Sequence, residues 1–107
     1  MDTPLKGRPD EVLDDLEQFI LEAIEREEIS QFYIGRSVDL DTTQERHGSD
    51  EIIPLYEPEN PDNAIELEES LLKTFYKHPK CENESEDDDA DIPAEVATCV
   101  YLAIWYR

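Results

Sequence analysis

Apolar and polar positions alternate with the period of a helix in the first part of the chain. Pro9 suits a first helical position, and over 10–28 the apolar residues recur every three or four positions: Val12, Leu13, Leu16, Phe19, Ile20, Ala23 and Ile24. The positions between them are mostly acidic. The pattern predicts one amphipathic helix over 10–28, after a flexible N-terminus at 1–9. Its apolar side is expected to cover a sheet.

Three further segments have strand character. The run 32–36 is aromatic and β-branched, and Gly35 near its end predicts a sharp exit from the strand. The run 51–56 is a second strand, in which Pro54 indicates an edge position or a bulge. We expect these two strands to pair with each other across a short helical turn. The run 97–106 is apolar at both alternations, which predicts a central strand.

A second helix is predicted from about 60 to 77. Asn60 and Pro61 supply a cap and a first-turn proline, and Pro79 ends the helix. Its apolar stripe comprises Ala64, Leu67, Leu71 and Phe75, widened by Ile65, Leu72 and Tyr76. Glu68 lies near the boundary of this stripe, where the carboxylate either faces a cleft or is solvated. The acidic run 84–95 follows, and its dense like charges predict a mobile loop.

These elements fit a single domain over 1–107. Their order predicts an α+β fold with a small antiparallel sheet of about three strands and two main helices packed on it. The chain has no apolar run long enough to span a bilayer and no signal-peptide pattern at 1–9, so a cytoplasmic location without membrane contact is expected. In that compartment Cys81 and Cys99 are expected to be reduced thiols, although a bridge between them stays open.

Charge narrows the choice of partner. The formal net charge is −20, from 29 acidic against 9 basic residues. Such a surface repels phosphate backbones at ordinary ionic strength, which disfavours a free-standing nucleic-acid binder. Beside a simply solvated surface, two explanations stand. One is adaptation to near-saturating salt, where the screening length is about 3 Å or less. The other is an acidic face that binds a basic protein partner, as in a DNA mimic, with carboxylates spread over a convex face at phosphate-like spacing.

The segment 32–83 carries a set of short motifs. Tyr33-Ile34-Gly35 is followed by Arg46-His47, then by Glu68 in the second predicted helix, and finally by Asn83. In order and spacing this resembles the second half of a GIY-YIG endonuclease domain. The family's first motif is absent, because the first helix occupies that part of the chain. Its arginine, expected near Thr43, is displaced to Arg46, with Arg36 as a second candidate.

The resemblance implies a reaction and a set of roles. In the family, a tyrosine assists deprotonation of the attacking water, an arginine stabilises the phosphoryl charge, and a glutamate holds one divalent metal, usually Mg²⁺, for hydrolysis of a phosphodiester in DNA. By motif, Tyr33 takes the role of the tyrosine, Arg46 or Arg36 the arginine, and Asn83 the late asparagine. His47 is a further catalytic candidate, and Glu68 is the metal ligand. One carboxylate plus waters is an acceptable Mg²⁺ site.

Two classes of function therefore remain from the sequence. The first is a GIY-YIG-like domain, either an active nuclease adapted to high salt or a catalytically degenerate relative. The second is an acidic protein-binding module that inhibits a basic nucleic-acid-binding protein. The nuclease requires Tyr33, an arginine and Glu68 to converge on one cleft, and it fails if Glu68 faces the helix-covered core away from Tyr33.

Overall fold

The computed structural model describes residues 4–58, 60–81 and 99–107. In this part of the chain three helices and three strands follow one another as α1 (Pro9–Ile24), β1 (Ile29–Ser37), α2 (Leu40–His47), β2 (Glu51–Tyr56), α3 (Pro61–Phe75) and β3 (Cys99–Tyr106). The segment predicted as an acidic loop, 84–95, lies outside the described residues, as does Asn83. The expected α+β class with a small antiparallel sheet is confirmed.

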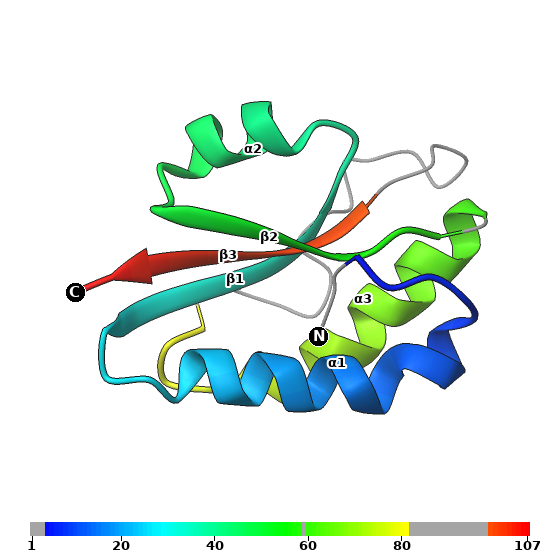
Figure 1. Cartoon of the computed structure of the whole chain (residues 1–107), viewed down its shortest axis with the longest axis horizontal. Helices are drawn as coiled ribbons and strands as arrows, with labels where there is room; N and C mark the ends of the chain where they lie inside the picture. The colour runs from blue at the N-terminus through cyan, green and yellow to red at the C-terminus, as the bar shows by residue number, and fades with distance from the viewer. Residues whose placement is uncertain (1–3, 59, 82–98) are drawn as a thin grey trace.

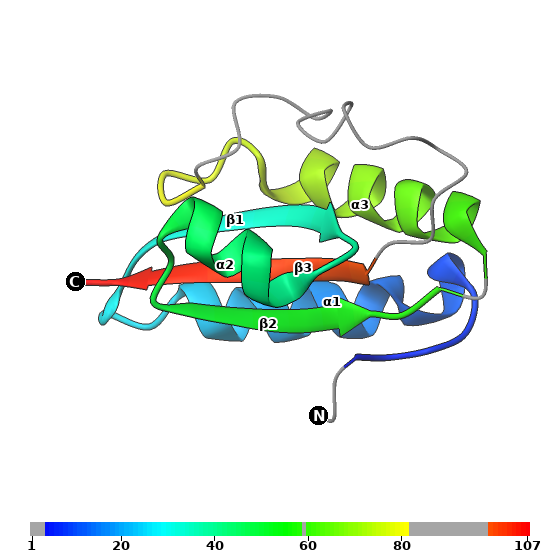
Figure 2. The same ribbon diagram turned by 90° about the horizontal axis from the view of Figure 1, so that it is seen from above.

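The elements form three layers. The sheet lies in the middle, with α1 and α3 side by side below it and the short α2 above it in the view of Figure 1. Seen from above, the strands run in the order β1-β3-β2 (Figure 2). β3 is antiparallel to both neighbours, so the C-terminal strand is central, as its apolar pattern predicts. The expected pairing of β1 with β2 is wrong, because β3 lies between them.

The core fills the space between the sheet and the α1/α3 layer. From β1 it takes Phe32 and Ile34, and from β3 it takes Val100, Leu102 and Ile104, which are alternate residues of each strand. The remaining alternate residues, among them Tyr33 and Tyr101, face α2. The sheet is therefore covered on both faces, which explains why β3 is apolar at every position from Val100 to Ile104.

Helix α1 begins as predicted but ends early. Pro9 stands in its first turn, while the last helical residue is Ile24 rather than a residue near 28. The last turn of α1 contains no basic side chain of its own. Instead Lys80, which lies after α3, donates from Nζ to the carbonyl oxygens of Ile24 at 2.7 Å and Arg26 at 3.1 Å. A cation at a helix C-terminus satisfies unpaired carbonyls and offsets the helix dipole.

Both ends of α2 are marked by residues typical of helix caps, Asp39 at the start and Gly48 at the end. The Asp39 carboxylate accepts hydrogen bonds from the Thr42 hydroxyl and from the backbone N–H groups of Thr42 and Asp41. These bonds, the Thr42 hydroxyl above all, hold the pKa of Asp39 below its usual value. Gly48 closes the helix at φ 67°, a left-handed conformation that glycine adopts without strain. Gly35, by contrast, is not among the glycines with positive φ. Strand β1 runs through Gly35 to Ser37, so the sharp exit predicted there is wrong.

The two cysteines are free thiols. Burial raises the pKa of the Cys99 thiol above its usual value. No helix in the described ranges is both long and apolar enough to cross a membrane.

Candidate functional site

The sheet separates the residues that the sequence proposes for one site. Arg36 and Tyr33 are three positions apart in β1, so their side chains leave opposite faces of the strand. Arg36 faces the α1/α3 layer and Tyr33 faces α2. Glu68 of α3 lies with Arg36. The convergence of Tyr33 and Glu68 on one cleft, which the nuclease hypothesis requires, is therefore absent from the described residues.

Arg36 and Glu68 form a buried ion pair. The Arg36 Nε donates to the Glu68 Oε1 at 3.0 Å, and the two side chains are 5% and 2% exposed. Glu68 lies in the middle of the apolar stripe of α3, between Leu67 and Leu71 and not at its margin. The pairing explains how a carboxylate and a guanidinium are accommodated in the core, because each neutralises the charge of the other.

On the other face, Tyr33, His47 and Tyr101 pack together under α2. The rings of Tyr33 and His47 have centroids 4.6 Å apart, and the His47 Nε2 lies 2.9 Å from the Tyr101 hydroxyl oxygen. Trp105 meets His47 edge-on at 6.2 Å and donates from its indole N–H to the Gly48 carbonyl. This aromatic cluster packs α2 against the sheet.

Two further candidates remain, Arg46 and Asn83. Arg46 is exposed on α2, next to His47 in sequence. Asn83 is outside the described residues. The sequence identifies His47 and Arg36 as candidates, but their actual partners, Tyr101 and Glu68, could only be found by placing β3 and α3 against β1.

Glu68 is poorly suited to hold Mg²⁺. This ion keeps several water ligands and needs room for an octahedral shell. The Glu68 carboxylate is instead enclosed by core residues and accepts a hydrogen bond from a guanidinium. Among the described residues no three His, Cys, Asp or Glu side chains are grouped as metal ligands would be. The residues present at Glu68 do not fit the metal that the family resemblance implies.

The outer surface of α1 is rich in carboxylates. The helix carries six carboxylates and no lysine or arginine between Pro9 and Ile24: Asp10, Glu11, Asp14, Asp15, Glu17 and Glu22. All of these except the half-buried Glu17 are exposed. α1 lies at the bottom of the molecule in the view of Figure 1, with the sheet above it.

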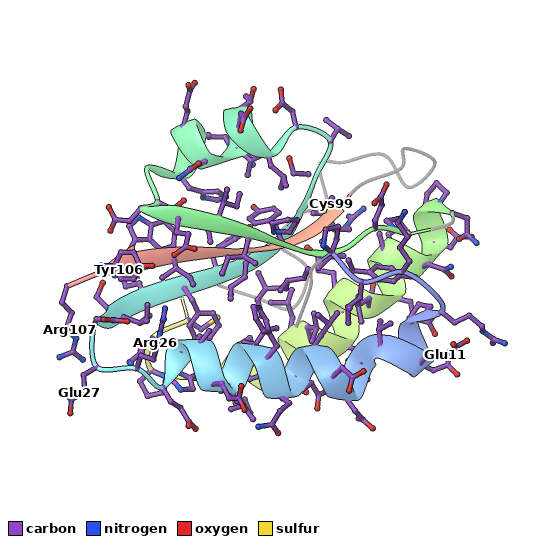
Figure 3. The ribbon with its side chains drawn as sticks, in the orientation of Figure 1. Glu11, Arg26, Glu27, Cys99, Tyr106 and Arg107 are labelled. Carbon is purple, nitrogen blue, oxygen red and sulfur yellow. The ribbon has the colours of Figure 1, made fainter. Side chains whose placement is uncertain are left out.

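An open groove of about 550 Å³ lies between α1 and the edge of the sheet. One wall is formed by Phe19, Glu22 and Ala23 of α1, at helical spacing, and by Arg26, two residues after the helix ends. The other wall is formed by Glu51 and Ile53 of β2 and by Tyr106 at the end of β3. Figure 3 labels one residue from each wall, Arg26 and Tyr106. Sequence reasoning missed this groove, since it assigned the apolar residues of α1 to the core alone.

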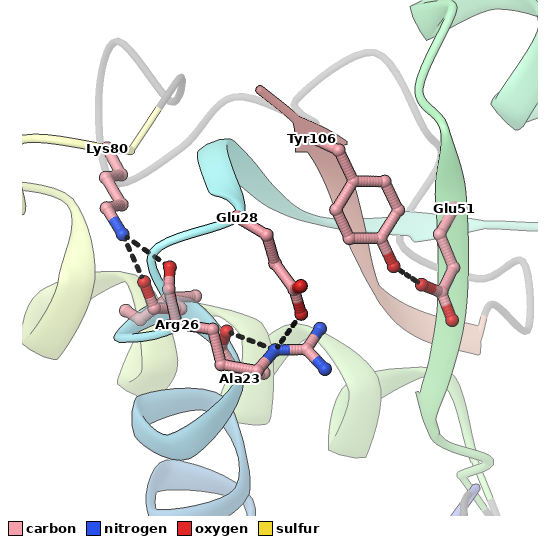
Figure 4. Close-up of polar contacts among 7 residues, drawn as sticks. Ala23, Arg26, Glu28, Glu51, Lys80 and Tyr106 are labelled. Atoms are coloured by element: carbon pink, nitrogen blue, oxygen red, sulfur yellow. Dashed lines mark hydrogen bonds and ion pairs between the residues drawn. The ribbon is translucent and has the colours of Figure 1, made fainter.

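Two polar groups of the groove, Tyr106 and Glu51, are hydrogen-bonded to each other. The Tyr106 hydroxyl donates to the Glu51 carboxylate, and this hydrogen bond is the main reason why the pKa of Tyr106 is raised above its usual value (Figure 4). The Arg26 guanidinium lies 3.3 Å from the Glu28 carboxylate and donates to the Ala23 carbonyl. Glu22 and Glu51 therefore contribute negative charge on opposite walls, while the charge of Arg26 is offset by Glu28.

The geometry thus comprises a buried ion pair below the sheet, an aromatic cluster above it, and an acidic helix with a groove at the sheet edge. The first two stabilise the fold, and the last two are accessible to a partner. Comparisons with known proteins assign no family to this arrangement, because no protein-family model, no curated protein and no solved structure matches the chain.

Proposed function

We propose that this chain is an acidic protein-binding module that engages a basic partner, of the kind that binds nucleic acid. The observation that carries the proposal is the exposed side of α1, with its carboxylates and no basic residue between Pro9 and Ile24. Such a field attracts positively charged surfaces over a distance and speeds their encounter. A cytoplasmic location belongs to the same proposal.

The charge density of α1 supports a DNA-like surface. The helix has 16 residues, which corresponds to a length of about 24 Å. Its six carboxylates are unevenly spaced but average one per roughly 4 Å of axis, and a DNA strand carries one phosphate per about 3.4 Å. A basic groove that accepts one strand of DNA would meet a similar charge density on α1.

The nuclease hypothesis receives less support from the geometry. Its metal ligand, Glu68, is buried beside Arg36, and its tyrosine is on the opposite face of the sheet. Within the described ranges, no three His, Cys, Asp or Glu side chains are grouped so that they could hold the metal elsewhere. The nuclease therefore stays a prediction of the family resemblance, and cleavage of plasmid DNA with Mg²⁺ across a salt series would test it.

The binding proposal is tested by competition. A labelled DNA duplex is first bound by a short oligolysine peptide, and the chain is then titrated into the complex while the fluorescence anisotropy of the DNA is followed. We expect the chain to release the DNA by taking up the peptide, and to do so less effectively as salt is added, because surface charges are screened.

Variants with equal charge locate the binding face. Glu11→Gln combined with Asp15→Asn removes two exposed carboxylates from α1, whereas Asp41→Asn combined with Glu45→Gln removes two from α2. Both leave a net charge of −18, from −20 plus two. We expect the α1 variant to weaken peptide uptake several-fold more than the α2 variant. Failure of the unmodified chain to bind the peptide at any salt would overturn the proposed function.

A further inference from the structure

We infer that the groove between α1 and β2 receives an extended, basic segment of the partner protein, with one apolar side chain packed on Phe19, Ala23 and Ile53. The lysine or arginine residues that flank this side chain would face Glu22 on one wall and Glu51 on the other. This inference rests on the proposed function and adds the docking surface and the chemistry of the segment.

The floor of the groove is apolar and incompletely covered. Phe19, Ala23 and Ile53 pack against the core on one side and remain half-buried on the groove side. Tyr106, which also lines the groove, is 39% exposed and leaves part of its ring in contact with solvent. Burying one aromatic or branched apolar side chain on such a surface stabilises a complex by about 1.5–3 kcal/mol, or roughly tenfold or more in affinity.

The sheet edge beside the groove favours an extended occupant. β2 is an edge strand, and Leu5 pairs with it only at its far end, through the Leu55 carbonyl at 2.9 Å and the Glu57 N–H at 3.0 Å. Along Glu51 to Pro54 no described segment pairs with the outer side of β2. An edge of this kind is a template for an added strand, and side chains of that strand would alternate into the groove.

The negative charge of the chain favours a basic segment of another protein over a second copy of the chain as the occupant of the groove. Two copies would each bring a net charge of −20 to the interface, and the walls of the groove would add Glu22 and Glu51 to this repulsion. A basic segment instead gains an opposite charge on both sides of its apolar residue. The groove is also open along the sheet edge, which suits a chain segment better than a small molecule that must be enclosed.

The test uses two labelled peptides that differ at one position. Both contain lysines on either side of a central residue, which is phenylalanine in one peptide and serine in the other. Affinities are measured by fluorescence anisotropy at the lowest salt at which circular dichroism shows the chain to be folded. We expect the phenylalanine peptide to bind about tenfold more tightly, because its ring is buried on the groove floor.

Matched variants separate the groove from general attraction. Glu22→Gln with Glu51→Gln neutralises both walls, and Asp41→Asn with Glu45→Gln makes the same charge change on α2. We expect the wall variant to lose about tenfold in affinity, which corresponds to roughly 1.4 kcal/mol of binding free energy. The α2 variant should lose much less. If both variants lose affinity equally and both peptides bind equally well, the groove is not the docking site. The proposal of an acidic binding module would still stand.

Two further outcomes are decisive. If neither peptide binds, the proposed function fails together with the groove. If sedimentation shows that the chain dimerises and that Glu22→Gln with Glu51→Gln strengthens the dimer, the occupant is a second copy and the inference is wrong. Thermal melts of each variant confirm that a lost affinity does not reflect a lost fold.

Discussion

The pairing of Arg36 with Glu68 is the residue-scale feature that most changes the interpretation of the sequence. Helical spacing correctly places Glu68 close to the buried stripe of α3. Spacing alone, however, cannot tell whether a residue lies at the margin or at the centre of that stripe. The partner could not be predicted either, since it depends on how α3 crosses β1. With its partner in place, Glu68 is a buried structural charge.

Removing one member of this pair should destabilise the fold strongly. Glu68→Ala leaves the Arg36 guanidinium buried without its counter-charge, which typically costs about 3–5 kcal/mol. We expect urea denaturation to show a loss of this size in the free energy of unfolding. The double variant Arg36→Met with Glu68→Leu should lose less than Glu68→Ala, because it leaves no unpaired charge.

The neighbouring Glu69 provides the control for this prediction. Its side chain is exposed on α3, so Glu69→Ala should change the free energy of unfolding by about 0.5 kcal/mol or less. Equal and small effects of both alanine substitutions would mean that Glu68 is solvated. A destabilised Glu68→Ala also affects the nuclease hypothesis, because loss of cleavage in that variant would then reflect unfolding.

A second residue-scale prediction concerns the titration of Tyr106. Its hydroxyl donates to Glu51, and this bond raises the pKa of Tyr106 above its ordinary value of 10.0. Because the pKa is higher in the folded state, the stabilising bond is fully present below the ordinary pKa and is lost as the pH rises through the folded value. Glu51→Gln should bring the pKa of Tyr106 back toward the ordinary range.

Phenolate absorbance measured against pH checks this titration. The difference between the unmodified chain and Tyr106→Phe isolates the signal of one tyrosine from those of the other four. In urea denaturation, the stability gap between these two proteins should shrink on going from neutral to strongly alkaline pH. A Tyr106 that titrates normally would show that the bond to Glu51 does not persist in solution.

At the scale of elements, local signals predict the helices and strands better than their arrangement. Pro9, Asn60 and the Asp39 to Gly48 segment carry cap or turn chemistry, so the helix starts and the position of α2 follow from sequence. The strand order does not, because β1 and β2 both pair with β3, which is far away in the chain. The apolar pattern of β3 on both alternations predicts its central position, but the short connection between β1 and β2 favours their pairing, and these two expectations conflict.

The end of α1 depends on a residue from another element. Lys80 supplies the positive charge that the last turn of α1 lacks, by donating to the carbonyls of Ile24 and Arg26 (Figure 4). Lys80→Met keeps the apolar stem and removes the donor. We expect a loss of about 1–2 kcal/mol in the free energy of unfolding, from the lost charged hydrogen bonds and helix-end charge.

Hydrogen exchange adds a local readout to this substitution. The amides of the last turn of α1 should exchange faster in Lys80→Met, while those of α3 should be unchanged. Lys73→Met makes the same charge change at an exposed position of α3 and serves as the control. If both variants behave alike, the effect is one of net charge, and Lys80 does not cap α1.

At the scale of the whole molecule, the net charge of −20 acts on folding and on binding in opposite directions. Carboxylates that repel one another destabilise the compact state, whereas the same carboxylates attract a basic partner. Salt weakens both interactions. The salt dependence of the two properties therefore separates a surface made for binding from one that serves only to keep the chain folded in concentrated salt.

Stability and peptide affinity should both depend on salt concentration, but in opposite directions. The Debye length falls from about 30 Å at 0.01 M salt to about 10 Å at 0.1 M and 3 Å at 1 M. For a binding module, the urea midpoint should rise steeply up to a few tenths molar and then level off, while affinity for the lysine peptide falls over the same range. A folded state and a tight complex then coexist at ordinary ionic strength. A chain adapted to saturating salt would instead keep gaining stability into the molar range. It would be largely unfolded at the lower salt concentrations at which the peptide binds, and this result would contradict the proposed function.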